Sequence, residues 1–519
     1  MFSNVAKELI QRLCRFAWFH VRGNRFSLEL FYFLFVSLFG FFILQTLDGR
    51  TPSFTRPRNL DLFFTSVSAV TTSSMSVIEM EFFSNTQLAI LTILMFGGGE
   101  VFTSLVMHYI HMFFINVSPK DCNIVNPASQ CGFFDTIELE NIKIQEFGNA
   151  KSDNLCNQTF STAENYKEGD LRYKSLKFLG FVVLFYLVCV QVLGLVSVLI
   201  YLNVISSAKD ILNQKGIHSL TFSIFTTVST FANCGFLPNN ENMLIFRKNS
   251  GLLLILIPQA LLGNTLYPPA FRFLIWAIGK FVKKSETTYL LDNSKGMIGY
   301  HHLHSFVHSS LLSVSALVLI VMQYVVFSSM EWSSGSLGGL SVYQKLVGIL
   351  FQTVNTRHAG ESIVDLSTVS GAVLVLFVLM MYLPPYTVFL PVEEDGYNYE
   401  KGNKRSTKIL ENLVFSQQTY LIIFIILVCI TERKQMVNDP LNFNVLNIVF
   451  EVISAYGNVG LSTGYRCDLR LEQDGGCQNK WYGFSGRWSD QGKLVLIVVM
   501  IFGKLKKFNM NGGKTWKVL

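Results

Sequence analysis

The stretch FSIFTTVSTFANCGFLPNN, residues 222–240, runs from a helix-compatible segment through a glycine to a polar exit. Three other stretches follow the same plan: FFTSVSAVTTSSMSVIEM at 63–80, LFQTVNTRHAGESIVDL at 350–366 and FEVISAYGNVGLSTGY at 450–465. About ten helical residues reach only about 15 Å, half the thickness of a bilayer. Each stretch is therefore predicted to enter a membrane as a half-helix and turn back.

Long apolar segments flank these four stretches. Half of the 519 residues are hydrophobic and only 15% are charged, which is outside the range of soluble proteins. The apolar segments are residues 28–47, 87–115, 178–205, 251–278, 306–327, 371–390, 420–430 and 494–502. The sequence predicts an all-α integral membrane protein of four membrane-pore loop-membrane repeats, with eight spanning helices and four re-entrant half-helices around a single pseudo-fourfold pore.

Basic residues lie before the first span and after the last one, which predicts a multi-pass protein with both termini in the cytoplasm. The net charge of +7 therefore reflects topology, and we expect no nucleic-acid partner. The expected order is a cytoplasmic N-terminus (1–26), repeat 1 (27–115), a cytoplasmic loop (116–174), repeat 2 (175–279), a loop (280–302), repeat 3 (303–392), a loop (393–417), repeat 4 (418–508) and a cytoplasmic C-terminus (509–519).

The half-helices would point their carbonyl ends, which carry partial negative charge, at the pore centre and so favour a cation. The turn that follows must expose backbone carbonyls, and glycine adopts such turns at low cost. Gly235, Gly360 and Gly460 take that place in repeats 2 to 4, and the alignment puts Ser76 there in repeat 1. Flanking residues of this expected filter are Ser74, Met75, Asn233, Cys234, His358, Ala359, Asn458, Val459 and Asn240.

Several long motifs carry a family resemblance: DLFFTSVSAVTTSSMS (61–76), EMEFFSNTQ (79–87), FANCGFLPNNENM (231–243), GNTLYPP (263–269), NTRHAGESIVDLS (355–367) and SAYGNVGLSTGY (454–465). The chain closely resembles the plant high-affinity potassium transporter (HKT) family of the Trk/Ktr/HKT cation transporter superfamily. The resemblance implies a filter of four glycine-position residues, with Na⁺ at the backbone carbonyls of Ser76, Gly235, Gly360 and Gly460. A serine in the first loop marks the sodium-selective subfamily I, and Asn240 resembles an asparagine of its members.

The resemblance also implies a homodimer in a plant plasma membrane and a role in salt tolerance. The first-loop serine has an alternative reading as an ordinary turn residue, because Ser73 and Ser74 lie in the same stretch. A side chain at a ring of carbonyls would narrow the site and disfavour the larger potassium ion.

Five ionisable residues are candidates for pore or gate charges. Glu100 lies in the second apolar segment, where it either faces the pore or serves helix packing. Lys504 stands where the family usually has an arginine below the filter, which the resemblance links to gating. Glu79 and Glu361 follow their loops and either concentrate cations at the outer mouth or cap a loop, while Arg466 either lowers sodium entry or points into solvent.

His358 is expected to be a packing residue rather than a pH gate. Cys467 and Cys477 share one short segment, where a disulfide and two free thiols remain open.

Other function classes lack support in the sequence. We find no paired carboxylates, nucleophile motif, metal cluster or phosphate-binding loop, so we expect no enzyme activity and no cofactor. A non-conducting receptor would not need four re-entrant segments. The expected function is passive, channel-like movement of Na⁺ through the lipid bilayer, driven by its gradient and the membrane potential. A Na⁺/K⁺ symporter or K⁺-permeable member of the same family is the alternative.

Overall fold

A computed structural model describes residues 25–50, 56–121, 154–282, 285–292, 300, 302–388, 417–470 and 477–509, and in these ranges every regular element is a helix. The chain divides into two compact units. Unit 1 contains Met1–Thr103, Tyr186–Arg272 and His301–Leu519, and unit 2 contains Ser104–Phe185 and Phe273–Tyr300.

Each repeat consists of a first helix, a pore helix and a second helix. These are α2 (Arg25–Thr46), α3 (Asn59–Val70) and α4 (Asn85–Gly98); α6 (Asn154–Val204), α8 (Ser219–Ala232) and α9 (Ser250–Leu262); α12 (Phe306–Glu331), α13 (Val342–Asn355) and α14 (Gly371–Tyr382); and α16 (Gln417–Thr431), α18 (Val445–Gly457) and α19 (Asp490–Asn509). The pore helices have only 12 to 14 residues. At 1.5 Å per residue they are too short to cross a bilayer, as the re-entrant prediction requires.

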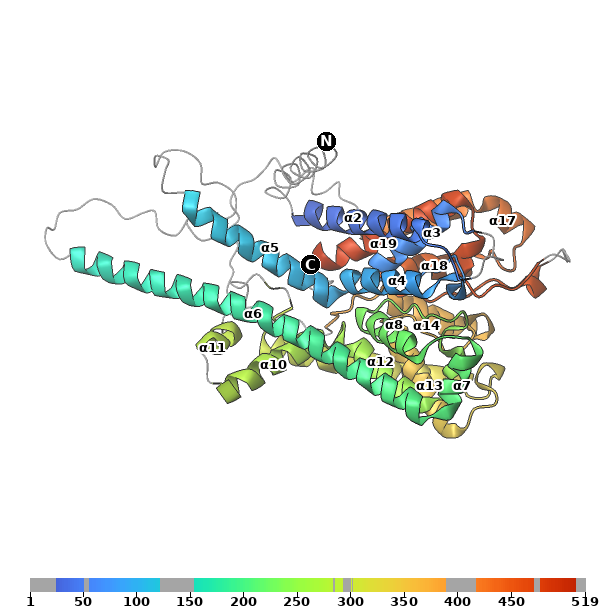
Figure 1. The fold of residues 1–519 in the computed structure, drawn as a ribbon. Helices are drawn as coiled ribbons and strands as arrows, with labels where there is room; N and C mark the ends of the chain where they lie inside the picture. The colour runs from blue at the N-terminus through green and yellow to red at the C-terminus, as the bar shows by residue number, and fades with distance from the viewer. Residues whose placement is uncertain are drawn as a thin grey trace. The chain divides into compact units, whose positions relative to one another are not determined.

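The four repeats close into a ring. The second helix of each repeat packs against the pore helix of the next: α4 contacts α8, α9 contacts α13, α14 contacts α18, and α19 returns to α3. Figure 1 shows this return, with the red helices of repeat 4 beside the blue helices of repeat 1. The order of contacts confirms the predicted pseudo-fourfold arrangement.

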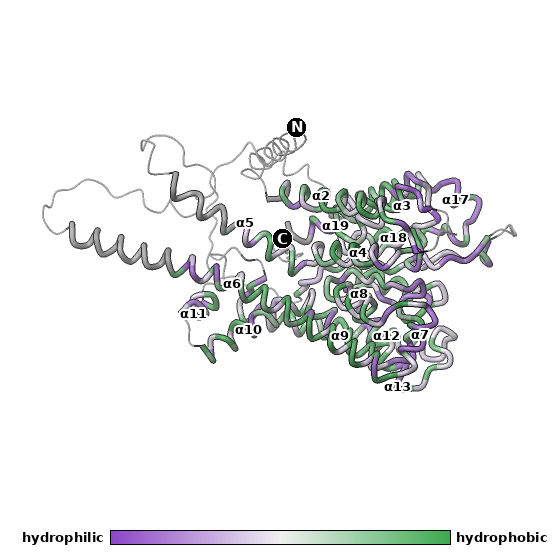
Figure 2. The backbone as a smooth tube through the Cα atoms, in the orientation of Figure 1, coloured by the Kyte–Doolittle hydropathy of each residue, from purple (hydrophilic) through white to green (hydrophobic). Residues whose placement is uncertain are grey.

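The outer helices present apolar side chains to their surroundings. In the described residues, α2, the C-terminal part of α6 and α12 are long and apolar enough to cross a membrane, and two bent helix pairs bring the possible number to five. Phe31, Phe35 and Phe39 are exposed along one face of α2. Figure 2 shows such helices in green and the loops near α7 and α17 (Ser206–Gln214 and Arg433–Asn438) largely in purple, as expected for lipid-facing helices and wetted loops.

Two apolar segments expected to be single spans contain a sharp bend. Segment 87–115 bends by 60° at Gly99, between α4 and α5 (Glu100–Asp121), and segment 251–278 bends by 81° between α9 and α10 (Tyr267–Val282). Gly99 has extended backbone angles, φ −59° and ψ 142°. In the second break, Pro268 and Pro269 lack the N–H groups needed to continue the preceding helix.

Two expected loops are partly helical. Helix α5 continues to Asp121, α6 begins at Asn154, and α11 (Ser285–Asp292) lies within the expected loop 280–302. Within unit 2, His108 bonds the Leu176 carbonyl at 2.9 Å and Ser104 bonds the Tyr300 hydroxyl at 3.0 Å. The loop residues 122–153 and 393–416 lie outside the described part of the chain.

Glycines allow second helices to approach pore helices closely. A β-carbon on Gly98 would lie 1.9 Å from the Val70 carbonyl oxygen, far inside van der Waals contact. Two other repeats show the same approach, with 1.8 Å for Gly263 against Phe231 and 2.1 Å for Gly503 against Tyr456. At these three places a glycine therefore permits a close helix contact that a side chain would prevent.

Candidate functional site

The loops after the four pore helices each contain a residue with positive φ. Gly235, Gly360 and Gly460 have φ values of +88°, +69° and +94°, which L-residues with a side chain seldom adopt. In repeat 1 the residue with positive φ at this place is Ser74, at +50°. We call Ser74, Gly235, Gly360 and Gly460 the central ring.

The hydrogen bonds fix the register of repeat 1. In three repeats the N–H just before the ring residue donates to a pore-helix carbonyl five residues earlier: Ser73 to Ser68, Cys234 to Ser229 and Val459 to Ser454. Ser74 therefore aligns with the glycines, and Ser76, the residue expected from sequence, lies two positions beyond the ring. Ser76 instead accepts hydrogen bonds from the Gly483 N–H through its hydroxyl and carbonyl oxygens, at 3.1 and 2.9 Å.

Neighbouring members of the ring are in close contact. A β-carbon on Gly235 would lie 1.5 Å from the Ala359 carbonyl oxygen, and one on Gly360 would lie 2.1 Å from that of Val459. One on Gly460 would lie 2.6 Å from the Ser73 carbonyl oxygen. Each glycine thus faces the residue before the next ring position, and repeat 4 closes on repeat 1. Because a side chain would collide with backbone, glycine is required at these three places.

All four ring residues line one cavity of about 480 Å³, which we call the ring cavity. Loops of all four repeats contribute to its wall, including Ser76 and Asn240. The Asn240 side-chain oxygen accepts the Glu81 N–H at 2.9 Å, so it joins the loops of repeats 1 and 2.

Two of the candidate charges lie near the ring cavity. Arg466 lines it and donates to Asp468 through Nε and Nη2, at 3.2 and 2.5 Å. This hydrogen bond lowers the pKa of the Asp468 carboxyl. Glu79 Oε2 lies 3.8 Å from Lys480 Nζ, so its charge is partly balanced.

Glu361 does not lie at the mouth of the cavity, and that expectation is wrong. Its side chain is fully buried, and its Oε1 accepts a hydrogen bond of 2.5 Å from the Thr230 hydroxyl. Successive side chains of this loop point in different directions. The side chain of Glu361, directly after Gly360, points into the protein.

The remaining candidates are also buried. Lys504 on α19 is 2% exposed, and its ammonium donates to the Thr72 hydroxyl at 2.7 Å, two residues before the ring. Glu100 begins α5 and accepts the Tyr386 hydroxyl at 2.7 Å. His358 is hydrogen-bonded through both ring nitrogens, at 2.6 Å to the Val354 carbonyl and 2.8 Å to Thr265, as expected of a packing residue.

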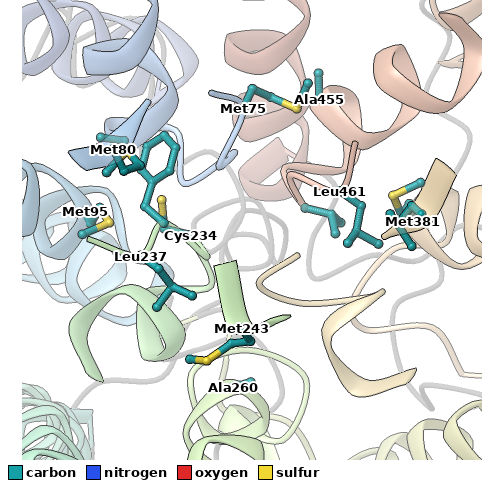
Figure 3. Close-up of a cluster of buried hydrophobic side chains, with 14 of the residues drawn as sticks. Met75, Met80, Met95, Cys234, Leu237, Met243, Ala260, Met381, Ala455 and Leu461 are labelled. Atoms are coloured by element: carbon teal, nitrogen blue, oxygen red, sulfur yellow. The ribbon is translucent and has the colours of Figure 1, made fainter. Parts of the chain in front are cut away.

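The other flanking residues surround the ring with buried groups. Figure 3 shows Met75 pointing toward Ala455 and Leu461 toward Met381. Asn233 and Asn458 have φ near +55° and cap their pore helices. Their amides donate to second-helix carbonyls, Asn233 to Ala260 at 3.2 Å and Asn458 to Met500 at 3.0 Å.

Cys234, Ala359 and Val459 precede the ring glycines and are buried.

Two groups of ion pairs near the site were missed by the sequence analysis. A buried ion pair of 2.7 Å joins Lys493 on α19 to Asp61 on α3. Lys215 pairs with Glu81 at 2.9 Å and also with Glu241. Burial opposes the charge of Lys215, but its hydrogen bonds to both carboxylates raise its pKa. Such pairs join residues far apart in sequence, which no spacing rule detects.

A disulfide joins Cys467 to Cys477, with α-carbons 5.8 Å apart. It lies directly before the segment that contributes Lys480 and Gly483 to the ring cavity wall. Among the described residues no group of three or more His, Cys, Asp or Glu side chains is placed to hold a metal ion.

Comparisons with known proteins identify the family of this chain. The model of the TrkH family, described as cation transport proteins, matches residues 156–387 and 404–510. Cation transporter HKT1;3 of Oryza sativa subsp. japonica is 47% identical over 519 residues, covering 100% of this chain and 96% of the relative. Sodium transporter HKT1 of Arabidopsis thaliana is 48% identical over 482 residues, covering 91% of each chain.

A solved structure, the potassium transporter TrkH of Vibrio parahaemolyticus, matches with a TM-score of 0.47 and 13% identity, covering 93% of this chain and 83% of that one. The family match and the full-length plant relatives show that this chain belongs to the HKT branch of the Trk/HKT superfamily of membrane cation transporters, which are not enzymes.

Proposed function

We propose that this protein lets Na⁺ flow passively across the plasma membrane through the central ring. The observation that carries the proposal is the ring itself. Four loops each place a residue with positive φ at the wall of one cavity, and three of these residues are glycines packed against a carbonyl of the next loop. Backbone carbonyls replace the hydration shell of a monovalent cation in filters of this kind. The name of the Arabidopsis relative, a sodium transporter, supports Na⁺ as the ion.

Ser74 is the proposed selectivity residue, in place of Ser76. It is the ring member that carries a side chain, and its hydroxyl oxygen lies 3.3 Å from the β-carbon position of Gly235. A side chain held there restricts the adjustment of the ring toward the larger, dehydrated potassium ion. Asn240 is proposed to support this loop through its hydrogen bond to Glu81.

The membrane potential drives the flow, since one charge gains about 2.3 kcal/mol per 100 mV. We further propose that both termini are cytoplasmic, as the basic ends of the chain favour, and that two copies associate in the membrane, as family resemblance implies. Lys504 is proposed to add a positive charge near the ring, because its buried ammonium contacts the loop of repeat 1.

The test is two-electrode voltage clamp of the expressed protein, with external Na⁺ and K⁺ varied separately. The reversal potential is expected to follow Na⁺ alone. Ser74→Gly should raise relative K⁺ permeability by about tenfold, equivalent to about 1.4 kcal/mol in barrier height. Ser76→Gly is the matched control and should leave selectivity unchanged, because Ser76 is outside the ring.

A wild-type potential that follows both ions would favour the symport alternative, and absence of current would refute conduction. Selectivity that changes with Ser76→Gly and not with Ser74→Gly would refute the register of repeat 1.

A further inference from the structure

The repeats differ in how they hold the ring, and repeat 3 is the one that has no serine behind it. Six residues before the ring position, repeats 1, 2 and 4 have Ser68, Ser229 and Ser454, whereas repeat 3 has Val354. The hydroxyls of Ser229 and Ser454 accept the N–H of Gly235 and Gly460, both at 3.0 Å. Val354 has no hydroxyl, and the Gly360 N–H bonds the Asn355 carbonyl instead. Repeat 3 therefore lacks the serine tether of repeats 2 and 4, whereas repeat 1 keeps the serine but its Ser68 hydroxyl has no hydrogen-bond partner.

The residue directly after the ring differs in the same repeat. It is Met75, Phe236 and Leu461 in repeats 1, 2 and 4, all buried and apolar. In repeat 3 it is Glu361, a carboxyl that is also fully buried. A buried carboxyl without a compensating partner is costly, so its presence at one of four equivalent positions calls for a specific role.

Glu361 finds its partner on the neighbouring repeat. Thr230 lies on α8 five residues before Gly235, and its hydroxyl donates to Glu361 at 2.5 Å. The equivalent helix position in repeat 4 is Ala455, toward which Met75 points in Figure 3. The same contact is thus apolar between repeats 4 and 1 and a hydrogen bond between repeats 2 and 3.

We propose that the Glu361–Thr230 hydrogen bond positions the repeat 3 member of the ring, in place of the missing serine tether, and so helps to set ion selectivity. Glu361 and Thr230 are positioning residues, since neither lines the ring cavity. The inference rests on the proposed function of the ring. A short, buried hydrogen bond to a carboxyl is directional, whereas an apolar contact such as Met75 with Ala455 allows sliding.

The experiment measures the Na⁺/K⁺ permeability ratio by voltage clamp, together with surface expression. Thr230→Val and Glu361→Met should each lower the ratio several-fold. Thr226→Val is the matched control, because the Thr226 hydroxyl is buried on the same helix and has no hydrogen-bond partner in the structure. It should retain the wild-type ratio.

A rescue separates positioning from general damage. Val354→Ser installs the serine found at the equivalent place in the other repeats, and it should restore much of the ratio lost in Thr230→Val. If Glu361→Met does not reach the surface, the double variant Thr230→Ala with Glu361→Met replaces it, because that pair copies Ala455 and Met75.

Wild-type selectivity in Thr230→Val and in the Glu361 variant that reaches the surface would overturn the proposal, as would loss in Thr226→Val of the same size. Failure of the proposed function is a separate result: the wild-type reversal potential would then not follow Na⁺.

Discussion

Replacing Lys493 by methionine tests the seam where the ring of repeats closes. Lys493 on α19 and Asp61 in the first turn of α3 form a 2.7 Å ion pair, and their side chains are only 2% and 12% exposed. Because α19 belongs to repeat 4 and α3 to repeat 1, the pair joins the first and last repeats. Asp61 also lies at the positive end of the α3 dipole.

The expected cost follows from what remains after the change. Removing one partner of a buried ion pair costs about 3–5 kcal/mol, because the other charge stays buried. Arg58 still contacts Asp61 at 3.1 Å, but its side chain is 57% exposed and compensates only partly. We therefore expect Lys493→Met to lower the free energy of unfolding by about 3 kcal/mol, the lower end of that range. The double variant Asp61→Asn with Lys493→Met removes both charges and should recover most of the loss.

The measurement is thermal unfolding of the purified, detergent-solubilised protein. Lys480→Met is the control, because its pair with Glu79 is longer, at 3.8 Å, and more exposed. It should cost below about 1 kcal/mol. If Lys493→Met unfolds at the same temperature as Lys480→Met, or if the double variant is no more stable than Lys493→Met, the role assigned to the pair is wrong.

Three further changes have distinct expected results. Gly98→Ala should destabilise the protein by about 1–3 kcal/mol in thermal unfolding, since the added β-carbon would collide with backbone. Gly97→Ala should be tolerated, because the nearest atom to its added β-carbon is 3.5 Å away. Equal effects of the two variants would contradict the close approach at Gly98. Lys504→Met should increase inward current relative to outward current, and Lys504→Arg should not; identical currents in both variants would exclude a role for the charge. Reduction of the disulfide, or Cys467→Ser with Cys477→Ser, should lower stability by about 2–3 kcal/mol for a loop of this length, and an unchanged unfolding temperature would argue against it.

The sequence predicted the repeats and three ring positions because glycine is a strong local signal. Each of Gly235, Gly360 and Gly460 follows a helix-compatible segment and adopts positive φ. Repeat 1 has no glycine in its loop, and the alignment placed Ser76 at the ring position although Ser73 and Ser74 lie in the same stretch. Only the backbone angles and the Ser73 hydrogen bond to Ser68 identify Ser74 as the equivalent residue.

Side-chain direction explains the other differences. Glu361 follows a loop glycine, which favours a solvated position from sequence alone, but the turn points it toward α8. The partners of Lys504 and Glu100 come from loops remote in sequence, at Thr72 and Tyr386. The bend at Gly99 is hidden by continuous hydrophobicity, because an apolar segment records burial in lipid and not the straightness of a helix.

The ring contains positions where only glycine fits, and the side chains behind it can vary. Steric contact requires glycine wherever a loop faces the carbonyl of the next repeat, and this holds for Gly235, Gly360 and Gly460. The supports behind the ring are under no such constraint, since a serine, a carboxyl or an ammonium can hold the same backbone from outside. A protein that evolves new ion preference at a fixed fold is therefore expected to change these supports and the side chain of Ser74 before it changes the glycines. The strict positions are those where backbone meets backbone, and the adjustable ones are those where a side chain intervenes.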